Sequence, residues 1–118
     1  MPKLIPFYRP HIGKEEIKSI KKVLNSGKLS GNGPFTKKVE KLIKSKINSK
    51  GVFLTTSCTH SLEMAAILLD LKENDEVIVP SFTFVSTALA FSMQGARIRF
   101  VDVKEENLNL DENLLKNL

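Results

Sequence analysis

Apolar residues recur every three or four positions along two stretches in the first half of the chain, and this spacing predicts two amphipathic helices. The first runs from Lys14 to Ser26, and Gly27 follows at the position where a left-handed residue ends a helix. The second begins at Pro34, which suits the first turn of a helix, and continues to Ile47. Prolines at positions 2, 6 and 10 exclude a helix before residue 14, so we expect an extended arm there.

From residue 51 onward, short apolar runs alternate with helical patterns. The runs predict three strands, at 51–55, 76–79 and 97–102, and the patterns between them predict helices at 59–71 and 83–94. Because the runs are continuously apolar, we expect a parallel sheet that is buried on both faces. Short connections with right-handed crossovers then give a doubly wound unit.

The expected fold is therefore α/β. An arm and two amphipathic helices occupy residues 1–50, and a parallel βαβαβ unit occupies residues 51–118. Gly95 is placed to close the helix before the third strand, and Asp111 is placed to cap a further helix.

Composition is that of an ordinary soluble domain, with 42% hydrophobic and 26% charged residues among 118. A single cysteine, the lack of a long apolar segment and the lack of an apolar leader predict a cytoplasmic protein that does not enter the membrane.

Charge is distributed unevenly. Residues 1–50 carry 13 basic and 3 acidic side chains, whereas residues 51–118 carry 5 basic and 10 acidic ones. A basic half is compatible with nucleic-acid binding. The lysines, however, follow the polar faces of the two predicted helices without interleaved aromatic residues, which favours solvated helix faces over a nucleic-acid partner.

Small hydroxyl residues gather where the first predicted strand meets a helix, in the sequence Thr-Thr-Ser-Cys-Thr-His over 55–60. The free N–H groups of a helix start there could hold a phosphate. Plain capping by Ser or Thr explains the same residues, and both interpretations stay open. The turn at 81–83 should lie at the same edge of the sheet, and it brings the aromatic ring of Phe84.

Three segments together, TTSCTHSLEMAA (55–66), PSFTFVST (80–87) and RIRFVDV (97–103), resemble the DegT/DnrJ/EryC1/StrS family of sugar aminotransferases that use pyridoxal 5′-phosphate (PLP). The resemblance is strongest to members that aminate dTDP-4-oxo-6-deoxyglucose for enterobacterial common antigen and related surface polysaccharides. It runs from about residue 5 to 118 and covers the N-terminal third of such an enzyme. It implies the N-terminal part of the large domain of a fold-type I PLP enzyme.

The resemblance also implies a cofactor site. Cys58 and Thr59 would hold the PLP phosphate, Phe84 would stack on the pyridine ring, and Ser86 would lie close by. The glycine-rich turn at 28–34 matches a family segment near the active-site entrance, although a turn of this composition is also an ordinary loop. Without the resemblance, Phe84 would be interpreted as a core aromatic residue of its helix.

Other chemistry is less favoured. A thiol at a helix start can be a nucleophile, but Cys58 has only the nearby His60 as a candidate base. His60 lacks a second metal ligand at a recognisable spacing, so we expect no metal site. Asp102 is a candidate loop anchor. Neither Lys72 nor Lys104 stands in surroundings that would depress the pKa of an amine, so neither is assigned as the Schiff-base lysine, and no catalytic residue is assigned.

We therefore expect a fragment of a PLP-dependent enzyme that transfers an amino group, from glutamate, to a nucleotide-linked 4-keto-6-deoxy sugar. Two or three charge-assisted hydrogen bonds of about 1.5–3 kcal/mol each barely offset an association cost of about 4–15 kcal/mol, so PLP binding by this piece should be weak. A second polypeptide or a homodimer would complete the enzyme. The alternative is a remnant, or a binding or regulatory protein, without transaminase activity.

Overall fold

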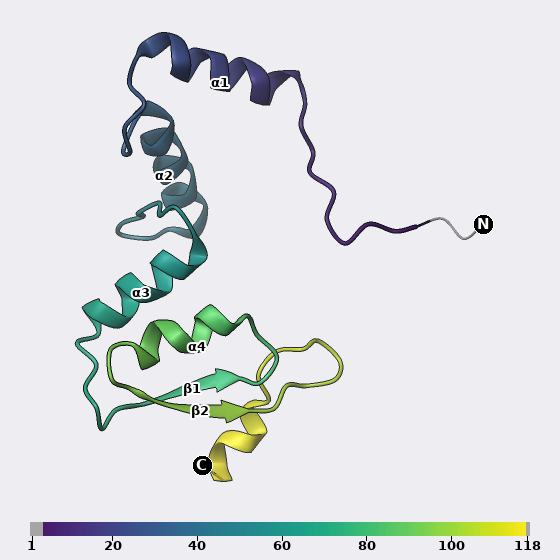
Figure 1. The fold of residues 1–118 in the computed structure, drawn as a ribbon, viewed down its shortest axis with the longest axis vertical. Coiled ribbons are helices and arrows are strands. Elements are labelled where there is room, and N and C mark those ends of the chain that lie inside the picture. Colours follow the sequence, from purple (N-terminus) through teal and green to yellow (C-terminus); the bar gives the residue numbers. More distant parts are fainter. Residues whose placement is uncertain (1–3, 118) are drawn as a thin grey trace. The chain divides into compact units, whose positions relative to one another are not determined.

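The computed structural model describes residues 4–117, so Pro2 of the predicted arm lies outside the described residues. The chain divides into two compact units, Met1–Leu54 and Thr55–Leu118. Figure 1 shows the helices of the first unit and the helices and strands of the second.

The first unit contains the arm and the helix α1, Lys14–Ser26. Residues 4–13 form no helix or strand, as the prolines predict. Gly13 precedes α1, and its N–H donates to Glu16 Oε2 at 2.7 Å. Gly27 ends the helix with φ 66°, and its N–H donates to the Leu24 carbonyl at 3.2 Å. The predicted left-handed cap is therefore confirmed.

The second helix of this unit, α2, is Pro34–Ile47, with proline in its first turn as predicted. It ends at Asn48, which takes a left-handed φ of 49°. None of the described residues between 4 and 54 is buried, and the apolar faces of α1 and α2 remain partly open to solvent.

The second unit is built around two parallel strands, β1 (Glu76–Pro80) and β2 (Arg97–Val101). Their register runs from Glu76 opposite Arg97 to Pro80 opposite Val101. The helix α4, Val85–Ser92, connects the strands and packs against both of them, and α3, Cys58–Leu68, packs against α4 (Figure 1). Five small or β-branched residues form the core: Ala66, Val79, Ala90, Ala96 and Val101. The α/β class and the parallel strand–helix–strand order are confirmed.

One predicted strand is not formed. Residues 51–55 contain no strand in the structure, and Phe53 is 80% exposed. A strand exists through its hydrogen bonds to a neighbour, and the described backbone hydrogen bonds give this segment none. The predicted βαβαβ unit is therefore reduced to the βαβ part from β1 to β2.

The remaining boundaries differ in smaller ways. The helices α3 and α4 both end earlier than the apolar patterns suggest, and Gly95, with φ 94°, closes the turn after α4 rather than the helix itself. The last helix is the 3₁₀ element η1, Glu112–Asn117. Asp111 caps it as predicted, because its Oδ1 accepts from the Asn113 N–H at 3.0 Å.

The expectation of a sheet buried on both faces is wrong for the described chain. Side chains at 76 and 78 share one face with their partners at 97 and 99. On that face Glu76 accepts from Arg97 Nη1 at 3.4 Å and from Arg99 Nε at 3.2 Å, and Ile78 is 43% exposed. Solvent therefore reaches this face at its Glu76 end, whereas Val101, two positions beyond Arg99 on the same face, is buried.

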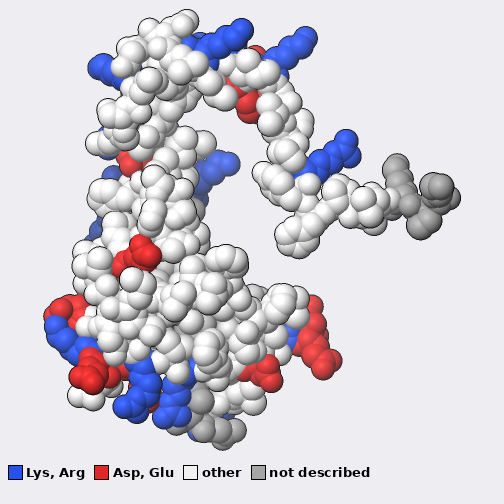
Figure 2. All heavy atoms as spheres, viewed as in Figure 1, with Lys and Arg blue, Asp and Glu red and all other residues white. Residues whose placement is uncertain are grey.

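Among the charged side chains of α1 and α2, lysines outnumber acidic residues, whereas acidic side chains are common in the second unit (Figure 2). Within α2, Lys37 Nζ pairs with Glu40 Oε2 at 3.1 Å. No helix among residues 4–117 has the length and apolar character needed to cross a bilayer.

Candidate functional site

The start of α3 leaves two backbone donors free of the helical hydrogen-bond ladder. Ser57 precedes the helix in an extended conformation, and its Oγ accepts from the His60 N–H at 3.2 Å. The first bond of the ladder runs from the Ser61 N–H to the Ser57 carbonyl at 3.2 Å. The N–H groups of Cys58 and Thr59 come before that bond, so the helix itself gives them no acceptor. Ser57 therefore caps the helix, as the capping interpretation predicts. The same helix start also leaves two backbone N–H groups that could bind an anion.

Hydroxyl groups around this turn bind one another. Thr55 Oγ1 donates to the Ser57 carbonyl at 2.8 Å and lies 2.5 Å from Ser61 Oγ. Thr56 Oγ1 lies 2.5 Å from His60 Nδ1. These bonds hold the backbone on either side of Cys58. They also pair the neighbouring polar side chains with one another.

The hydrogen bond of His60 is also relevant to the two other roles considered for this turn, a nucleophilic Cys58 and a metal site. His60 binds Thr56 through Nδ1, and no hydrogen bond between His60 and the Cys58 thiol is found among residues 4–117. The described residues contain no group of three or more His, Cys, Asp or Glu side chains that could hold a metal ion.

The start of α4 carries the other two predicted site residues. Phe84 occupies the cap position in an extended conformation, and its side chain is 72% exposed. Within this chain the ring therefore lies outside the core. Ser86 is the second residue of α4 and is half-buried.

The ends of the two strands are tied to each other at this edge of the sheet. Ser81, which follows β1, donates from Oγ to Asp102 Oδ1 at 2.9 Å, and its N–H donates to the Val101 carbonyl at 2.8 Å. Asp102 is thus the loop anchor that its position suggested. Figure 1 shows that α3 and α4 both begin on the side at which β1 and β2 end. The four predicted site residues therefore lie at the starts of two helices that pack against each other.

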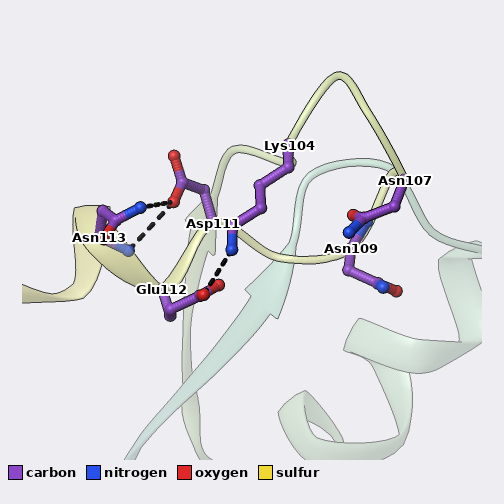
Figure 3. Close-up of polar contacts among 6 residues, drawn as sticks. All are labelled: Lys104, Asn107, Asn109, Asp111, Glu112 and Asn113. Carbon is purple, nitrogen blue, oxygen red and sulfur yellow. Dashed lines mark hydrogen bonds and ion pairs between the residues drawn. The ribbon is translucent and has the colours of Figure 1, made fainter.

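Sequence reasoning missed a closed loop after β2 (Figure 3). An antiparallel bridge joins Val103 to Leu110, and Lys104 Nζ forms an ion pair with Glu112 across the base of the loop. Leu108 takes a left-handed φ of 58° within the loop, and its N–H donates to the Lys104 carbonyl at 2.9 Å. Asn107 and Asp111 were the signal for such turns, because their side-chain oxygens accept from the N–H groups of Asn109 and Asn113, two residues further along.

The ion pair also affects the protonation of Lys104. Its hydrogen bond with Glu112 raises the pKa of the Lys104 amine, and the same bond lowers the pKa of the Glu112 carboxyl. A raised pKa keeps the amine protonated, whereas a lysine that attacks a carbonyl must lose its proton.

A model of the DegT/DnrJ/EryC1/StrS aminotransferase family matches residues 10–118. The chain belongs to this family. The match includes both helix starts described above and the loop that follows β2.

Individual relatives and solved structures support the family assignment. The spore coat polysaccharide biosynthesis protein SpsC of Bacillus subtilis is 37% identical over 107 residues, which are 91% of this chain and 27% of SpsC. Among solved structures, the E. coli GDP-4-keto-6-deoxy-D-mannose-3-dehydratase with bound hydrated PLP has a TM-score of 0.86 at 27% identity, over 95% of this chain and 30% of the dehydratase. Spr1654 of Streptococcus pneumoniae, assigned as a sugar aminotransferase and solved in its PLP form, has a TM-score of 0.80 at 29% identity, over 96% of this chain and 29% of Spr1654.

These likenesses establish the fold as that of PLP-dependent sugar-modifying enzymes of this family. The chain spans less than a third of the length of each of these relatives. For this chain, the activity, substrates and partners of a whole enzyme are therefore proposals.

The donor set at the helix starts fits the phosphate end of PLP. Two free backbone N–H groups, the Thr59 hydroxyl and the positive end of the α3 dipole are all donors or positive charges, and the Phe84 ring at the start of α4 is an exposed flat apolar surface. A phosphorylated aromatic cofactor requires both kinds of surface.

Proposed function

We propose that this chain is the phosphate-binding part of a PLP-dependent sugar aminotransferase. The observation that carries the proposal is the start of α3, where Ser57 caps the helix and leaves the N–H groups of Cys58 and Thr59 for an anion. The chain belongs to an aminotransferase family, and solved structures similar to it contain PLP, so the anion is assigned as the PLP phosphate.

Each residue has a limited part in this proposal. Cys58 and Thr59 bind and orient the phosphate through backbone N–H groups, and the ring of Phe84 covers a face of the pyridine. Ser86 contributes a hydroxyl near the same helix start. PLP, when bound, supplies the electron sink that amino-group transfer requires.

Other groups of the reaction must come from elsewhere. Lys104 is held protonated by Glu112, and Lys72 is bound to Asp70 Oδ1 at 2.5 Å on the surface. We infer that the covalent lysine and the acid that binds the pyridine nitrogen are supplied by a further segment or a second polypeptide, and that a homodimer is the natural completed form. A cytoplasmic location fits this role.

The substrate proposed is a nucleotide-linked 4-keto-6-deoxy sugar, with glutamate as the amino donor, for surface polysaccharide synthesis. Support comes from SpsC, which is named for spore coat polysaccharide biosynthesis, and from the dehydratase, which is named for a GDP-4-keto-6-deoxy sugar. The narrower choice of dTDP-4-oxo-6-deoxyglucose, and with it enterobacterial common antigen, rests on the sequence resemblance alone. Amino transfer is preferred over dehydration because the family model is that of aminotransferases.

A chimera tests this function. This chain would replace the aligned 29% of Spr1654, and Spr1654 would provide the rest of a related enzyme. The purified chimera should retain PLP through dialysis and should convert dTDP-, UDP- or GDP-linked 4-keto-6-deoxy sugars to amino sugars with glutamate, as followed by mass spectrometry. Spr1654 itself is the matched control.

Two results would count against the proposal. A folded chimera that loses PLP while Spr1654 keeps it would remove the cofactor role of this chain. A chimera that keeps PLP but releases water from the sugar instead of aminating it would replace the transaminase assignment by dehydration.

A further inference from the structure

The Ser57 carbonyl, at the start of α3, is held by a side chain as well as by the helix. The ladder bond from the Ser61 N–H to this oxygen is 3.2 Å long, whereas the bond from Thr55 Oγ1 is 2.8 Å, the usual length for a hydroxyl donor. A carbonyl oxygen has two lone pairs, and these two donors fill both. Thr55, which precedes the helix, thus supplies the shorter of the two bonds.

The proton of the Thr55 hydroxyl is used on this carbonyl. A hydroxyl has one proton and can also accept, and Thr55 Oγ1 lies 2.5 Å from Ser61 Oγ. Because Thr55 donates to Ser57, the Ser61 hydroxyl is the donor in this short contact, in preference to its own 3.4 Å approach to the Ser57 carbonyl. The two hydroxyl groups therefore form a chain that ends on the Ser57 carbonyl, and bonds in such a chain strengthen one another.

The direction of this carbonyl sets the direction of the next N–H group. The Ser57 carbonyl and the Cys58 N–H belong to one planar trans peptide unit, so they point in opposite directions. The carbonyl points into the first turn of α3, where the Ser61 N–H donates to it. The Cys58 N–H therefore points out of the N-terminal end of the helix. A group that prevents rotation of this peptide keeps the N–H in that direction.

We propose that Thr55 is a positioning residue for the PLP phosphate. Its hydroxyl holds the Ser57–Cys58 peptide at the carbonyl end, so that the N–H end already faces the place that the phosphate takes. Thr55 acts without touching the cofactor, because its side chain is half-buried and its proton is used on Ser57. A donor that is fixed in advance loses less conformational freedom on binding, which increases affinity. The inference rests on the proposed function, since it explains how one of the two phosphate donors is oriented.

PLP affinity in the Spr1654 chimera tests this role. Thr55→Val removes the hydroxyl and keeps the branched shape, whereas Thr55→Ser keeps the hydroxyl. Thr55→Val should weaken PLP binding about twofold to tenfold, the range that one neutral hydrogen bond covers, and Thr55→Ser should bind as the parent chimera does. Pyridoxal, which lacks the phosphate, should bind equally to all three proteins. A general loss of structure would weaken pyridoxal as well.

A double-mutant cycle shows whether Thr55 acts through the Cys58 N–H. Cys58→Pro has no N–H at this position, so Thr55→Val should cause no further loss of PLP affinity in that background. Additive losses would overturn the inference. Ser45→Ala is the matched control, because the Ser45 hydroxyl also donates to a backbone carbonyl at 2.8 Å, that of Leu42 in α2. It should leave PLP affinity unchanged.

NMR of the 118-residue chain gives a measurement that does not depend on the chimera. The chemical shift of a carbonyl carbon responds to its hydrogen bonds, so the Ser57 carbonyl resonance should move in Thr55→Val and stay close to its position in Thr55→Ser. An unmoved Ser57 resonance in Thr55→Val, or PLP affinity equal to that of a parent chimera that retains PLP, overturns this inference alone. A parent chimera that loses PLP removes the proposed function, and this inference with it.

Discussion

At the scale of single residues, capping residues hold the ends of the helices, and side-chain contacts join neighbouring turns. Ser57, Gly27 and Asp111 each take the role that residue type and position indicated, because capping depends on the residue and its immediate neighbours. The bonds from Thr56 to His60 and from Lys104 to Glu112 depend on how the turns fold. No periodicity in the sequence signals such bonds. The roles of Cys58, Thr59, Phe84 and Ser86 toward PLP stay predictions.

Removal of the Ser57 hydroxyl should loosen the first turn of α3. Ser57→Ala leaves the His60 N–H without its acceptor, and loss of such a cap costs about 1 kcal/mol. Amide hydrogen exchange over 58–62 should accelerate about fivefold. Ser92→Ala, at the exposed last position of α4, is the control and should change nothing in that range. Equal exchange in both variants would show that the hydroxyl does not hold the turn.

The loop after β2 should respond to pH at both ends of the range. The pKa of Glu112 is lowered, so its contribution to stability is present above its unfolded pKa and is lost as pH falls through the folded pKa. The pKa of Lys104 is raised, so its contribution is present below its unfolded pKa and is lost as pH rises through the folded pKa. The loop should therefore be most ordered between about pH 4 and pH 10.

An NMR titration of the two side chains measures this coupling. In Glu112→Gln the pKa of Lys104 should return toward its ordinary value, because the hydrogen bond is the largest cause of its shift. Glu105→Gln, in the exposed part of the same loop, should leave it raised. An unchanged Lys104 pKa in Glu112→Gln would contradict the ion pair.

At the scale of elements, the helices and the two paired strands follow their sequence patterns, whereas the strand at 51–55 does not. Helices satisfy their own backbone, so a pattern and two end signals are enough to predict them. A strand needs a neighbour, and its apolar run cannot show whether that neighbour lies within the chain. Burial of the sheet depends on neighbours in the same way. The apolar sequence of β2 is typical of a buried strand, yet Phe100 is 60% exposed.

Gly27 offers a direct test at this scale. Its φ of 66° lies in the left-handed region, where a Cβ costs about 1–2 kcal/mol. Gly27→Ala should therefore shorten or fray the end of α1 and lower helicity in circular dichroism. Gly31→Ala is the control, since no heavy atom lies within 4 Å of its added Cβ and its φ lies outside the left-handed region. Identical spectra for the two variants would show that α1 does not end at this cap.

At the scale of the whole molecule, the apolar surface exceeds what the chain covers by itself. Residues 4–54 contain no buried side chain, and Leu4, Ile5, Phe7 and Tyr8 of the arm are each more than three-quarters exposed. Surfaces of this kind mark contact with further protein. The two-stranded sheet also leaves its outer strand edges unpaired in the described chain.

The isolated chain should therefore self-associate. Sedimentation velocity should show a mass average that rises with concentration, and thermal unfolding should be broad. Phe7→Ser with Tyr8→Ser should reduce the association, while Lys41→Gln on the polar face of α2 should not. A monomer at all concentrations with a sharp cooperative melt would contradict the interpretation that this surface needs further protein.

The central claim is that the backbone at the start of α3 holds the PLP phosphate, and PLP affinity in the Spr1654 chimera tests it most directly. Cys58→Pro removes one free N–H and leaves the helix intact, because proline suits the first helical position and Ser57 is already extended. Cys58→Ala removes only the thiol. Loss of one charge-assisted hydrogen bond, about 1.5–3 kcal/mol, predicts at least tenfold weaker PLP binding in Cys58→Pro, unchanged binding in Cys58→Ala and no effect of either on pyridoxal, which lacks the phosphate. Equal PLP affinity in the proline and alanine variants would contradict the account.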